Sequence, residues 1–457
     1  MNPRTFPPSF AFGVATSSYQ IEGASFGEGR GTSIWDTFCR TPGKVANMEN
    51  GDVACDHYNR WSEDLDLIQS LGVDAYRFSI AWPRILPTGT EATANADGLA
   101  FYDRIVDGLL ERGITPWVTL YHWDLPQALE DAGGWPDRRI VDRFVQFADV
   151  MSRHLGDRVK HWITHNEPWV VCHLGYAVGE HAPGIKDTRT SLAAAHHVLL
   201  SHGAAVPVIR ANAPDARVGI TLNLCPADPA SDSAADRDAT RYFDGFFNRW
   251  YLDPLYGRGY PTDMVRDYVN RGDLPEDHPE VLDGDLETIA VETDFLGINY
   301  YSRAVIRDET ADDNLPQTEF QAPKEEHTEM GWEVHPQSLE KLLVRLHTEY
   351  GPDALYITEN GASYSTPPDA EGRIRDARRQ DYLHTHLEAV HNAIDSGAPV
   401  EGYFAWSLMD NFEWAFGYVQ RFGLVWVDYD TLDRTPKDSA LWYRDVAQSR
   451  RLPVRNP

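Results

Sequence analysis

The sequence predicts a single (β/α)₈ barrel over residues 1–457. Two observations lead to this fold class. Eight short β-prone apolar runs recur along the chain, and segments with helical periodicity lie between most of them. Strands that alternate with helices are typical of βαβ units around a parallel sheet, and eight units suit a closed barrel. An open doubly wound sheet is the alternative, but no Gly-rich dinucleotide turn follows a strand; the Gly-containing run 27–31 indicates a loop.

Each expected strand is a short run that is rich in β-branched, aromatic or other apolar residues. The eight runs are residues 10–15, 75–80, 115–120, 160–164, 217–222, 295–299, 354–358 and 402–407. The clearest helical periodicity lies in residues 140–154, 192–211, 339–350 and 379–395. No segment has the composition of an interdomain linker, so we expect one domain.

Three polar insertions follow the expected strands five, six and seven. They are residues 228–238, 308–330 and 363–378. In a barrel, such loops lie on the carboxyl-terminal face, where active sites are built.

The charge balance excludes several classes of partner. The chain has 41 Lys and Arg residues against 70 Asp and Glu residues, a formal net charge of -29. This balance argues against nucleic acid and anionic membranes. It also disfavours polyanionic substrates, unless a local basic pocket overrides the total charge. The first residues do not resemble a secretion signal, and no apolar run approaches the ~18 residues of a membrane span. Four dispersed cysteines suit reduced thiols, so we expect a cytoplasmic protein; one disulfide is the alternative.

Two glutamates stand where buried strands are expected to end. Glu167 follows the fourth strand, and Glu359 lies at the end of the seventh. Two carboxyl groups are the minimum equipment for cleaving a glycosidic bond, and a barrel would bring both into one mouth. Either glutamate alone would be interpreted as a solvated loop acid.

The neighbouring residue types suggest different roles for the two carboxyl groups. Trp162 and Trp169 lie close to Glu167 in sequence, and apolar surroundings would raise the pKa of that carboxyl. Arg77, on the expected second strand, could keep a nucleophilic carboxylate ionised; a structural salt bridge is an equal alternative.

Several motifs resemble glycoside hydrolase family 1, the β-glucosidases and their relatives. The similarity runs from residues 10–23 to residues 421–428, essentially the entire chain. Between these ends lie Tyr121-His122-Trp123-Asp124-Leu125-Pro126, Thr164-His165-Asn166-Glu167-Pro168, Gly297-Ile298-Asn299-Tyr300-Tyr301, Ile357-Thr358-Glu359-Asn360-Gly361 and residues 402–414. Together and in this order, the motifs are highly specific.

The resemblance implies a retaining double displacement. Glu359 resembles the nucleophile, and Glu167 resembles the acid/base. Arg77, Asn299 and Tyr301 resemble the groups that support these carboxyls. Retention implies a carboxyl separation of ~5 Å.

The resemblance also implies a sugar-binding pocket. The positions that match sugar-binding residues are Gln20, His122, Trp123, Asn166, Trp406, Glu413, Trp414 and Phe422. On the aglycone side, the matching positions are Trp169, Asn223 and Trp332. Core packing is the interpretation we keep for Trp61, Trp117 and Trp442.

The implied activity is an exo-acting β-glucosidase that removes terminal β-D-glucosyl residues from cello-oligosaccharides and aryl or alkyl β-glucosides. β-Galactosidase or β-fucosidase side activity is expected, and the glycone is expected to be unphosphorylated. Alternatives are a mainly transglycosylating enzyme or a catalytically silent sugar-binding protein. The only expected partners are small-molecule β-glycosides, with neither metal nor other cofactor; a homo-oligomer is possible.

Overall fold

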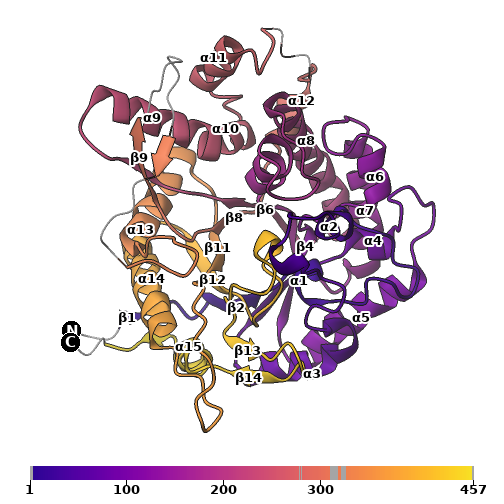
Figure 1. Ribbon diagram of the computed structural model, residues 1–457, viewed down its shortest axis with the longest axis vertical. Helices are drawn as coiled ribbons and strands as arrows, with labels where there is room; N and C mark the ends of the chain where they lie inside the picture. Colours follow the sequence, from indigo (N-terminus) through magenta and orange to yellow (C-terminus); the bar gives the residue numbers. More distant parts are fainter. Residues whose placement is uncertain (1–3, 277, 279, 309–317, 321–325, 455–457) are drawn as a thin grey trace.

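The computed structural model describes residues 4–276, 278, 280–308, 318–320 and 326–454. Its centre is a closed barrel of eight parallel strands, which confirms the predicted fold class (Figure 1). In chain order the strands are β2 (Ala11–Ala15), β3 (Ala75–Ser79), β4 (Thr115–Tyr121), β5 (His161–Asn166), β6 (Arg217–Asn223), β8 (Phe295–Asn299), β11 (Leu355–Asn360) and β12 (Val400–Trp406). Pairing of β12 with β2 closes the barrel.

Helices surround the barrel on its outer side (Figure 1). The longer helices are α3 (His57–Ser70), α5 (Ala96–Glu111), α7 (Ile140–Leu155), α8 (Thr188–Asn212), α9 (Ala234–Asp244), α11 (Thr262–Arg271), α13 (Pro336–Arg345), α14 (Ala377–Asp395) and α15 (Asp438–Ser449). The four segments predicted to be helical correspond to α7, α8, α13 and α14, and α13 continues into a π-helical turn, η4 (Leu346–Tyr350).

Shorter helices lie mainly in the loops. They are α1 (Ser18–Ile21), α2 (Ile34–Cys39), η1 (Ala46–Met48), α4 (Trp82–Ile85), α6 (Gln127–Asp131), η2 (Val170–Ala177), η3 (Gly245–Arg249), α10 (Trp250–Leu255), α12 (Asp285–Ile289) and η5 (Trp414–Phe416).

Small sheets flank the barrel. The pairs β1 (Arg4–Thr5) with β15 (Arg451–Leu452), and β13 (Val425–Val427) with β14 (Arg434–Pro436), are antiparallel. The first pair joins a segment near the start of the chain to one near its end (Figure 1). A third sheet contains β7 (Ala227–Pro229), β9 (Ala304–Asp308) and β10 (Thr318–Phe320).

The insertion at 228–238 is more ordered than a polar loop. It contains most of β7 and the start of α9. Ser233 caps α9 by accepting a hydrogen bond from the Asp236 backbone at 3.0 Å. Ala239 of α9 packs with Ile306 of β9 in a small satellite core. Much of the second insertion, residues 309–317 and 321–325, lies outside the described residues.

Aromatic side chains fill the barrel interior below its mouth. Trp117, Phe295, Tyr356 and Phe404 pack together there, with Trp117 and Phe404 ring centroids 5.0 Å apart. Gly13 leaves room for this layer, because a Cβ at that position would lie 2.3 Å from Phe404. The layer forms a floor beneath the carboxyl ends of the strands, and it confirms core packing for Trp117.

Helix α8 is long and apolar enough to cross a membrane by length and composition. However, 78% of its most apolar window is buried inside the protein. The apolar character of α8 is therefore explained by its packing, which includes contacts with α7.

Candidate active site

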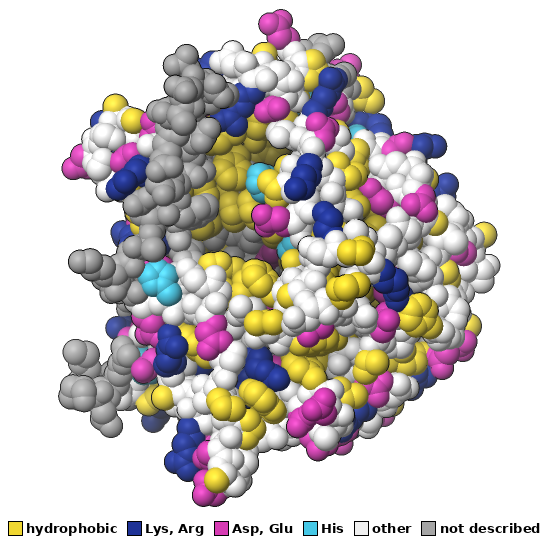
Figure 2. Space-filling view, viewed as in Figure 1, with side chains coloured by type: hydrophobic (Ala, Val, Ile, Leu, Met, Phe, Trp, Pro, Cys, Tyr) yellow, Lys and Arg dark blue, Asp and Glu magenta, His cyan; other side chains and the backbone are white. Residues whose placement is uncertain are grey.

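The predicted site residues lie together at the carboxyl ends of the barrel strands. Figure 2 shows this face hollowed over the barrel, with hydrophobic side chains deep in the hollow. Arg77 lies on β3, Glu359 lies on β11, and Asn299 ends β8. Asn166 ends β5, and Glu167 follows it directly. The remaining predicted residues lie at further strand ends or in the loops that follow them.

Glu359 is held from two sides. The Arg77 guanidinium donates to one carboxylate oxygen at 2.5 Å, and the Tyr301 hydroxyl donates to the other at 2.6 Å. Arg77 is fully buried and also donates to the Thr358 carbonyl and the Thr119 hydroxyl, at 3.1 and 3.2 Å. These bonds fix the position of the guanidinium. The ion pair of Arg77 is therefore with Glu359, inside the site, rather than with a carboxylate elsewhere in the protein.

Glu167 has a neutral partner instead. The Asn299 side-chain amide donates to its carboxyl oxygen at 2.6 Å, and only 5% of Glu167 is exposed. The expectation that Trp162 contributes apolar surroundings was wrong. Trp162 lies five residues earlier on β5, roughly 16 Å away along the strand, and its indole donates to the Val159 carbonyl at the opposite end. Strand position, rather than closeness in sequence, decides which tryptophans reach the mouth.

Burial and partners give the two carboxyl groups different acidities. Burial raises the pKa of Glu167 well above its ordinary value, and the charge of Glu359 raises it further. Burial also raises the pKa of Glu359, but Arg77 and the Tyr301 hydrogen bond oppose that rise. Glu359 is therefore the more acidic member of the pair, and Glu167 is the member that retains a proton.

Asn166 connects both carboxyl groups to the neighbouring histidine. Its side-chain oxygen accepts from Arg77 at 2.6 Å and from the Asn299 amide at 3.0 Å. The Asn166 amide nitrogen must therefore face His122, whose Nε2 lies 3.1 Å away. Burial, followed by the nearby Arg77 charge, holds the pKa of His122 well below its ordinary value. The ring is consequently neutral, and Nε2 accepts the hydrogen bond from the Asn166 amide.

One wall of the pocket is organised around Gln20, on α1. Its amide nitrogen donates to the Asn411 side chain at 3.0 Å and to the Phe412 carbonyl at 2.8 Å. It also lies 3.5 Å from a carboxyl oxygen of Glu413. The Ser17 hydroxyl donates to the amide oxygen at 2.5 Å, which fixes the orientation of the amide.

Glu413 is a third acid of the pocket. Burial and the charge of Glu359 raise its pKa to about 8, while the hydrogen bond from Gln20 opposes the rise. At neutral pH this carboxyl is mostly protonated.

Tryptophans complete the pocket. The Trp123 and Trp414 ring centroids lie 4.5 Å apart, and the Trp123 indole donates to the Asn166 carbonyl at 2.9 Å. Trp406 ends β12, is 4% exposed, and lies nearly parallel to the His122 ring at 5.8 Å. Phe422 packs in the same cluster as Trp406. The site therefore combines flat apolar surfaces with directed polar groups.

Three site residues adopt left-handed backbone conformations. Trp123, Glu167 and Trp414 have φ values of 79°, 52° and 50°. Such conformations cost of order 1–3 kcal/mol in non-glycine residues and cluster at functional sites. Here they occur at an acid and at the two tryptophans that pack against each other.

The predicted aglycone residues Trp169, Asn223 and Trp332 are all half-buried. The Trp169 ring stacks on Phe247, with ring centroids 4.0 Å apart. The ring centroids of Trp332 and Tyr301 lie 5.2 Å apart. Trp169 Nε1 and Asn223 Oδ1 are buried without a hydrogen-bond partner among the described residues. Among the described residues, Trp169 thus has an unused donor and Asn223 an unused acceptor.

Two contributors to the site were not singled out from the sequence. Asn411 orients Gln20, and its place in the motif over 402–414 was a usable signal. Phe247, in η3, supports Trp169. No sequence pattern marks Phe247, because the helical insertion that carries it is separated from Trp169 by a long stretch of chain.

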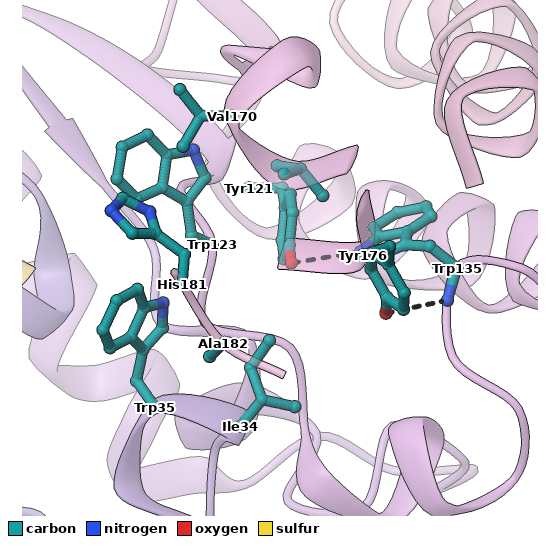
Figure 3. Close-up of a pocket in the computed structure, with 10 residues that line it drawn as sticks. Ile34, Trp35, Tyr121, Trp123, Trp135, Val170, Tyr176, His181 and Ala182 are labelled. Carbon is teal, nitrogen blue, oxygen red and sulfur yellow. Dashed lines mark hydrogen bonds between the residues drawn. The ribbon is translucent and has the colours of Figure 1, made fainter. Parts of the chain in front are cut away.

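A small cavity lies behind Trp123 (Figure 3). Trp35, Tyr121, Trp135 and His181 are among its lining residues. Its volume of about 10 Å³ suits one water molecule at most, so it is not a substrate pocket.

The described residues show no group of three or more His, Cys, Asp or Glu side chains arranged to hold a metal ion. All four cysteines are unpaired, as expected for reduced thiols. Burial raises the pKa of the Cys39 thiol to about 12, which keeps it protonated at neutral pH.

Comparison with known proteins gives one consistent result. Residues 2–452 match the family described as Glycosyl hydrolase family 1. Beta-glucosidase A of Thermotoga maritima is 47% identical over 454 residues, covering 99% of this chain and all of that protein. A bifunctional beta-D-glucosidase/beta-D-fucosidase of Bifidobacterium breve is 44% identical, covering 96% of this chain and 97% of that protein.

A solved structure gives the same answer. The Thermotoga maritima beta-glucosidase in complex with galacto-hydroximolactam has a TM-score of 0.93 and 46% identity, covering 98% of this chain and 100% of that chain. Motif order, barrel topology and site geometry agree with these matches: the chain belongs to glycosyl hydrolase family 1 and is a glycoside hydrolase.

Proposed function

We propose that this enzyme is a retaining β-glucosidase that removes terminal β-D-glucosyl residues from cello-oligosaccharides and from aryl or alkyl β-glucosides. The unequal partners of the two buried carboxyl groups carry the proposal. Glu359 has a cation and a phenol hydroxyl, whereas Glu167 has one neutral amide. A double displacement requires one carboxylate as nucleophile and one carboxylic acid as proton donor, and Glu359 and Glu167 are suited to these two roles.

In the first step, a carboxylate oxygen of Glu359 attacks the anomeric carbon and forms an ester bond. The bond from that carbon to the aglycone oxygen breaks as Glu167 transfers its proton to this oxygen. Arg77 and Tyr301 orient Glu359 and keep it ionised before attack. The aglycone leaves as an alcohol.

In the second step, water attacks the anomeric carbon from the side that the aglycone left. Esterification has removed the charge of Glu359, which is one cause of the raised pKa of Glu167. Glu167 therefore becomes more acidic and can accept a proton from the water. The ester bond breaks, Glu359 is restored, and the sugar leaves with its β configuration retained.

The glycone is a neutral hexose in this proposal. Gln20, His122, Asn166 and Glu413 offer amide, imidazole and carboxyl groups to its hydroxyls, and Trp406 offers a flat apolar surface. The aromatic floor closes the pocket below, which favours exo action on a chain end.

Glu413 also bears on phosphorylated sugars. Because its pKa is about 8, Glu413 is only partly ionised at neutral pH and repels a phosphate less strongly than a fully ionised carboxylate would. A phosphate there would still be desolvated beside Glu413 and Glu359, so we propose an unphosphorylated glycone.

Side activity on β-fucosides and β-galactosides is part of the proposal. One relative is named as both a glucosidase and a fucosidase, and one structural neighbour carries a galacto-configured ligand. On the aglycone side, the Trp169 ring and the unpartnered Asn223 oxygen suit a second sugar or an aryl group.

The test is to hydrolyse 4-nitrophenyl β-D-glucoside and follow the reaction by proton NMR. We expect β-glucose to appear first and α-glucose to appear only by mutarotation. Initial α-glucose would reject the retaining mechanism, and no turnover across a β-glycoside panel would reject a glucosidase in favour of a silent sugar-binding protein. Transfer products that exceed free glucose at high substrate concentration would favour transglycosylation.

A further inference from the structure

The glycone wall is built from two stretches of chain that follow β12. Residues 406–414 carry Trp406, Glu413 and Trp414, whereas Phe422 lies on the return stretch. The two stretches pair through backbone hydrogen bonds, including Leu424 N to Ser407 O at 2.8 Å and Asp410 N to Val425 O at 2.9 Å. Their separation sets the shape of the sugar pocket.

Asp410 lies between these stretches and is completely buried. One carboxylate oxygen accepts from Lys437 Nζ at 2.7 Å and from the Gly423 backbone at 2.9 Å. The other accepts from the Arg421 guanidinium at 2.8 Å. The carboxylate therefore ties the outgoing stretch to Gly423, the residue after Phe422.

The approach at Gly423 is close. A Cβ there would lie 2.0 Å from the Asp410 backbone nitrogen, so only glycine allows the two stretches to meet. Asn411, next to Asp410, donates to the Ser407 hydroxyl at 2.9 Å and accepts from Gln20 at 3.0 Å. Asp410 is thus one residue away from the contact that orients Gln20.

Charged groups from two directions face Lys437. Asp410 and Arg421 come from the glycone wall, and Asp376 and Arg379 from the start of α14. Burial, and then the charge of Arg379, lower the pKa of Lys437 to about 7, while Asp410 and Asp376 oppose this shift. With Lys437 neutral, these groups balance; with Lys437 protonated, they carry one excess positive charge.

We propose that Asp410 is a positioning residue for glycone recognition. Lys437 and Arg421 hold its carboxylate, and Asp410 in turn sets the positions at which Gln20 and Glu413 contact the sugar. The inference rests on the proposed glucosidase activity and deepens it. Asp410 lies behind the pocket wall and acts through Asn411 and Gly423, so its removal should affect hydroxyl recognition more than bond cleavage.

The test compares 4-nitrophenyl β-D-glucoside with its 4-deoxy analogue in wild type and in Asp410→Asn. The kcat/KM ratio of the two substrates measures recognition of the 4-hydroxyl group, because the resemblance to glycoside hydrolase family 1 implies that Gln20 and Glu413 contact this hydroxyl. We expect that ratio to fall at least about fivefold in Asp410→Asn, with the glucoside losing activity and the 4-deoxy substrate nearly unaffected. Lys437→Met is the second variant and should shift the ratio in the same direction.

Arg434→Met is the matched control. The side chain of Arg434 is as buried as that of Lys437 and pairs with Asp64 at 2.8 Å. It belongs to β14 and bonds to the Leu432 and Cys55 carbonyls, and it has no bond to the Asp410 carboxylate. Because the Cys55 thiol donates to the Asp410 backbone carbonyl at 3.2 Å, this control removes a buried charge beside the same backbone while leaving the Asp410 carboxylate and its partners in place. It should lower thermal stability and leave the substrate ratio within twofold of wild type.

Several outcomes would overturn the proposal. One is an equal loss on both substrates in Asp410→Asn and Lys437→Met, which indicates a purely structural role. Another is failure of both variants to fold while Arg434→Met folds. If wild type turns over neither substrate, the glucosidase proposal fails separately. In that case, calorimetry measures the Kd of glucose and of 4-deoxyglucose for wild type and for Asp410→Asn. A ratio of the two Kd values that is the same in both proteins overturns the positioning role.

Discussion

Removal of one hydroxyl group should separate the roles of the two carboxyls. In Tyr301→Phe, Glu359 loses the hydrogen bond that it accepts at 2.6 Å, while the ring remains. A hydrogen bond to a charged group contributes about 1.5–3 kcal/mol. Because this bond favours the ionised form, its loss should raise the pKa of Glu359 by about 1–2 units. The acidic limb of kcat/KM should move upward by the same amount.

The assay is the pH profile of kcat/KM for 4-nitrophenyl β-D-glucoside, because this profile reports the free enzyme. Tyr300→Phe is the matched control: its hydroxyl, one residue earlier, donates to the His335 carbonyl at 2.6 Å. The control should leave the acidic limb in place. If Tyr301→Phe moved the alkaline limb instead, the assignment of Glu359 as the ionised group would be refuted.

Three further predictions concern the acids and the core. Azide should restore turnover of an activated glucoside in Glu359→Gly with an α-glycosyl azide product, and in Glu167→Gly with a β product; exchanged products would reverse the roles. Glucose would bind best to ionised Glu413, whose pKa is about 8. The affinity for glucose, measured by calorimetry, should therefore increase as the pH rises toward 8, by up to about tenfold per pH unit, and level off above that pH. A flat profile in wild type, or one unchanged in Glu413→Gln, would contradict this. Gly13→Ala should cost about 1–3 kcal/mol in urea unfolding, because its Cβ would lie 2.3 Å from Phe404; unchanged stability would show that the ring moves freely.

The barrel could be predicted because its strands are short buried runs that recur with helices between them. Each expected run overlaps a barrel strand, with ends displaced by at most two residues. The secondary structure of the insertion at 228–238 was harder to predict, because it depends on tertiary contacts. The apolar side chains of α9 face β9, and the sequence pattern of that insertion does not show this partner.

Part of the site was also predictable. Strand-end position brought Glu167 and Glu359 into one mouth, and Arg77 on β3 does reach Glu359. For Trp162, closeness in sequence to Glu167 led to a wrong prediction. The position of Trp162 on β5 directs its side chain to the end of the strand opposite Glu167. The support of Trp169 by Phe247 depends on how a distant insertion folds back over the barrel, which local patterns do not encode.

Trapping of the glycosyl-enzyme tests the central claim most directly. A 2-deoxy-2-fluoro-β-glucoside with a good leaving group should slow the second step and allow the ester to accumulate. Proteolysis and mass spectrometry then locate the attached sugar. The proposed mechanism predicts a single modification at Glu359. A sugar on Glu167, or stoichiometric turnover without any covalent adduct, would contradict it.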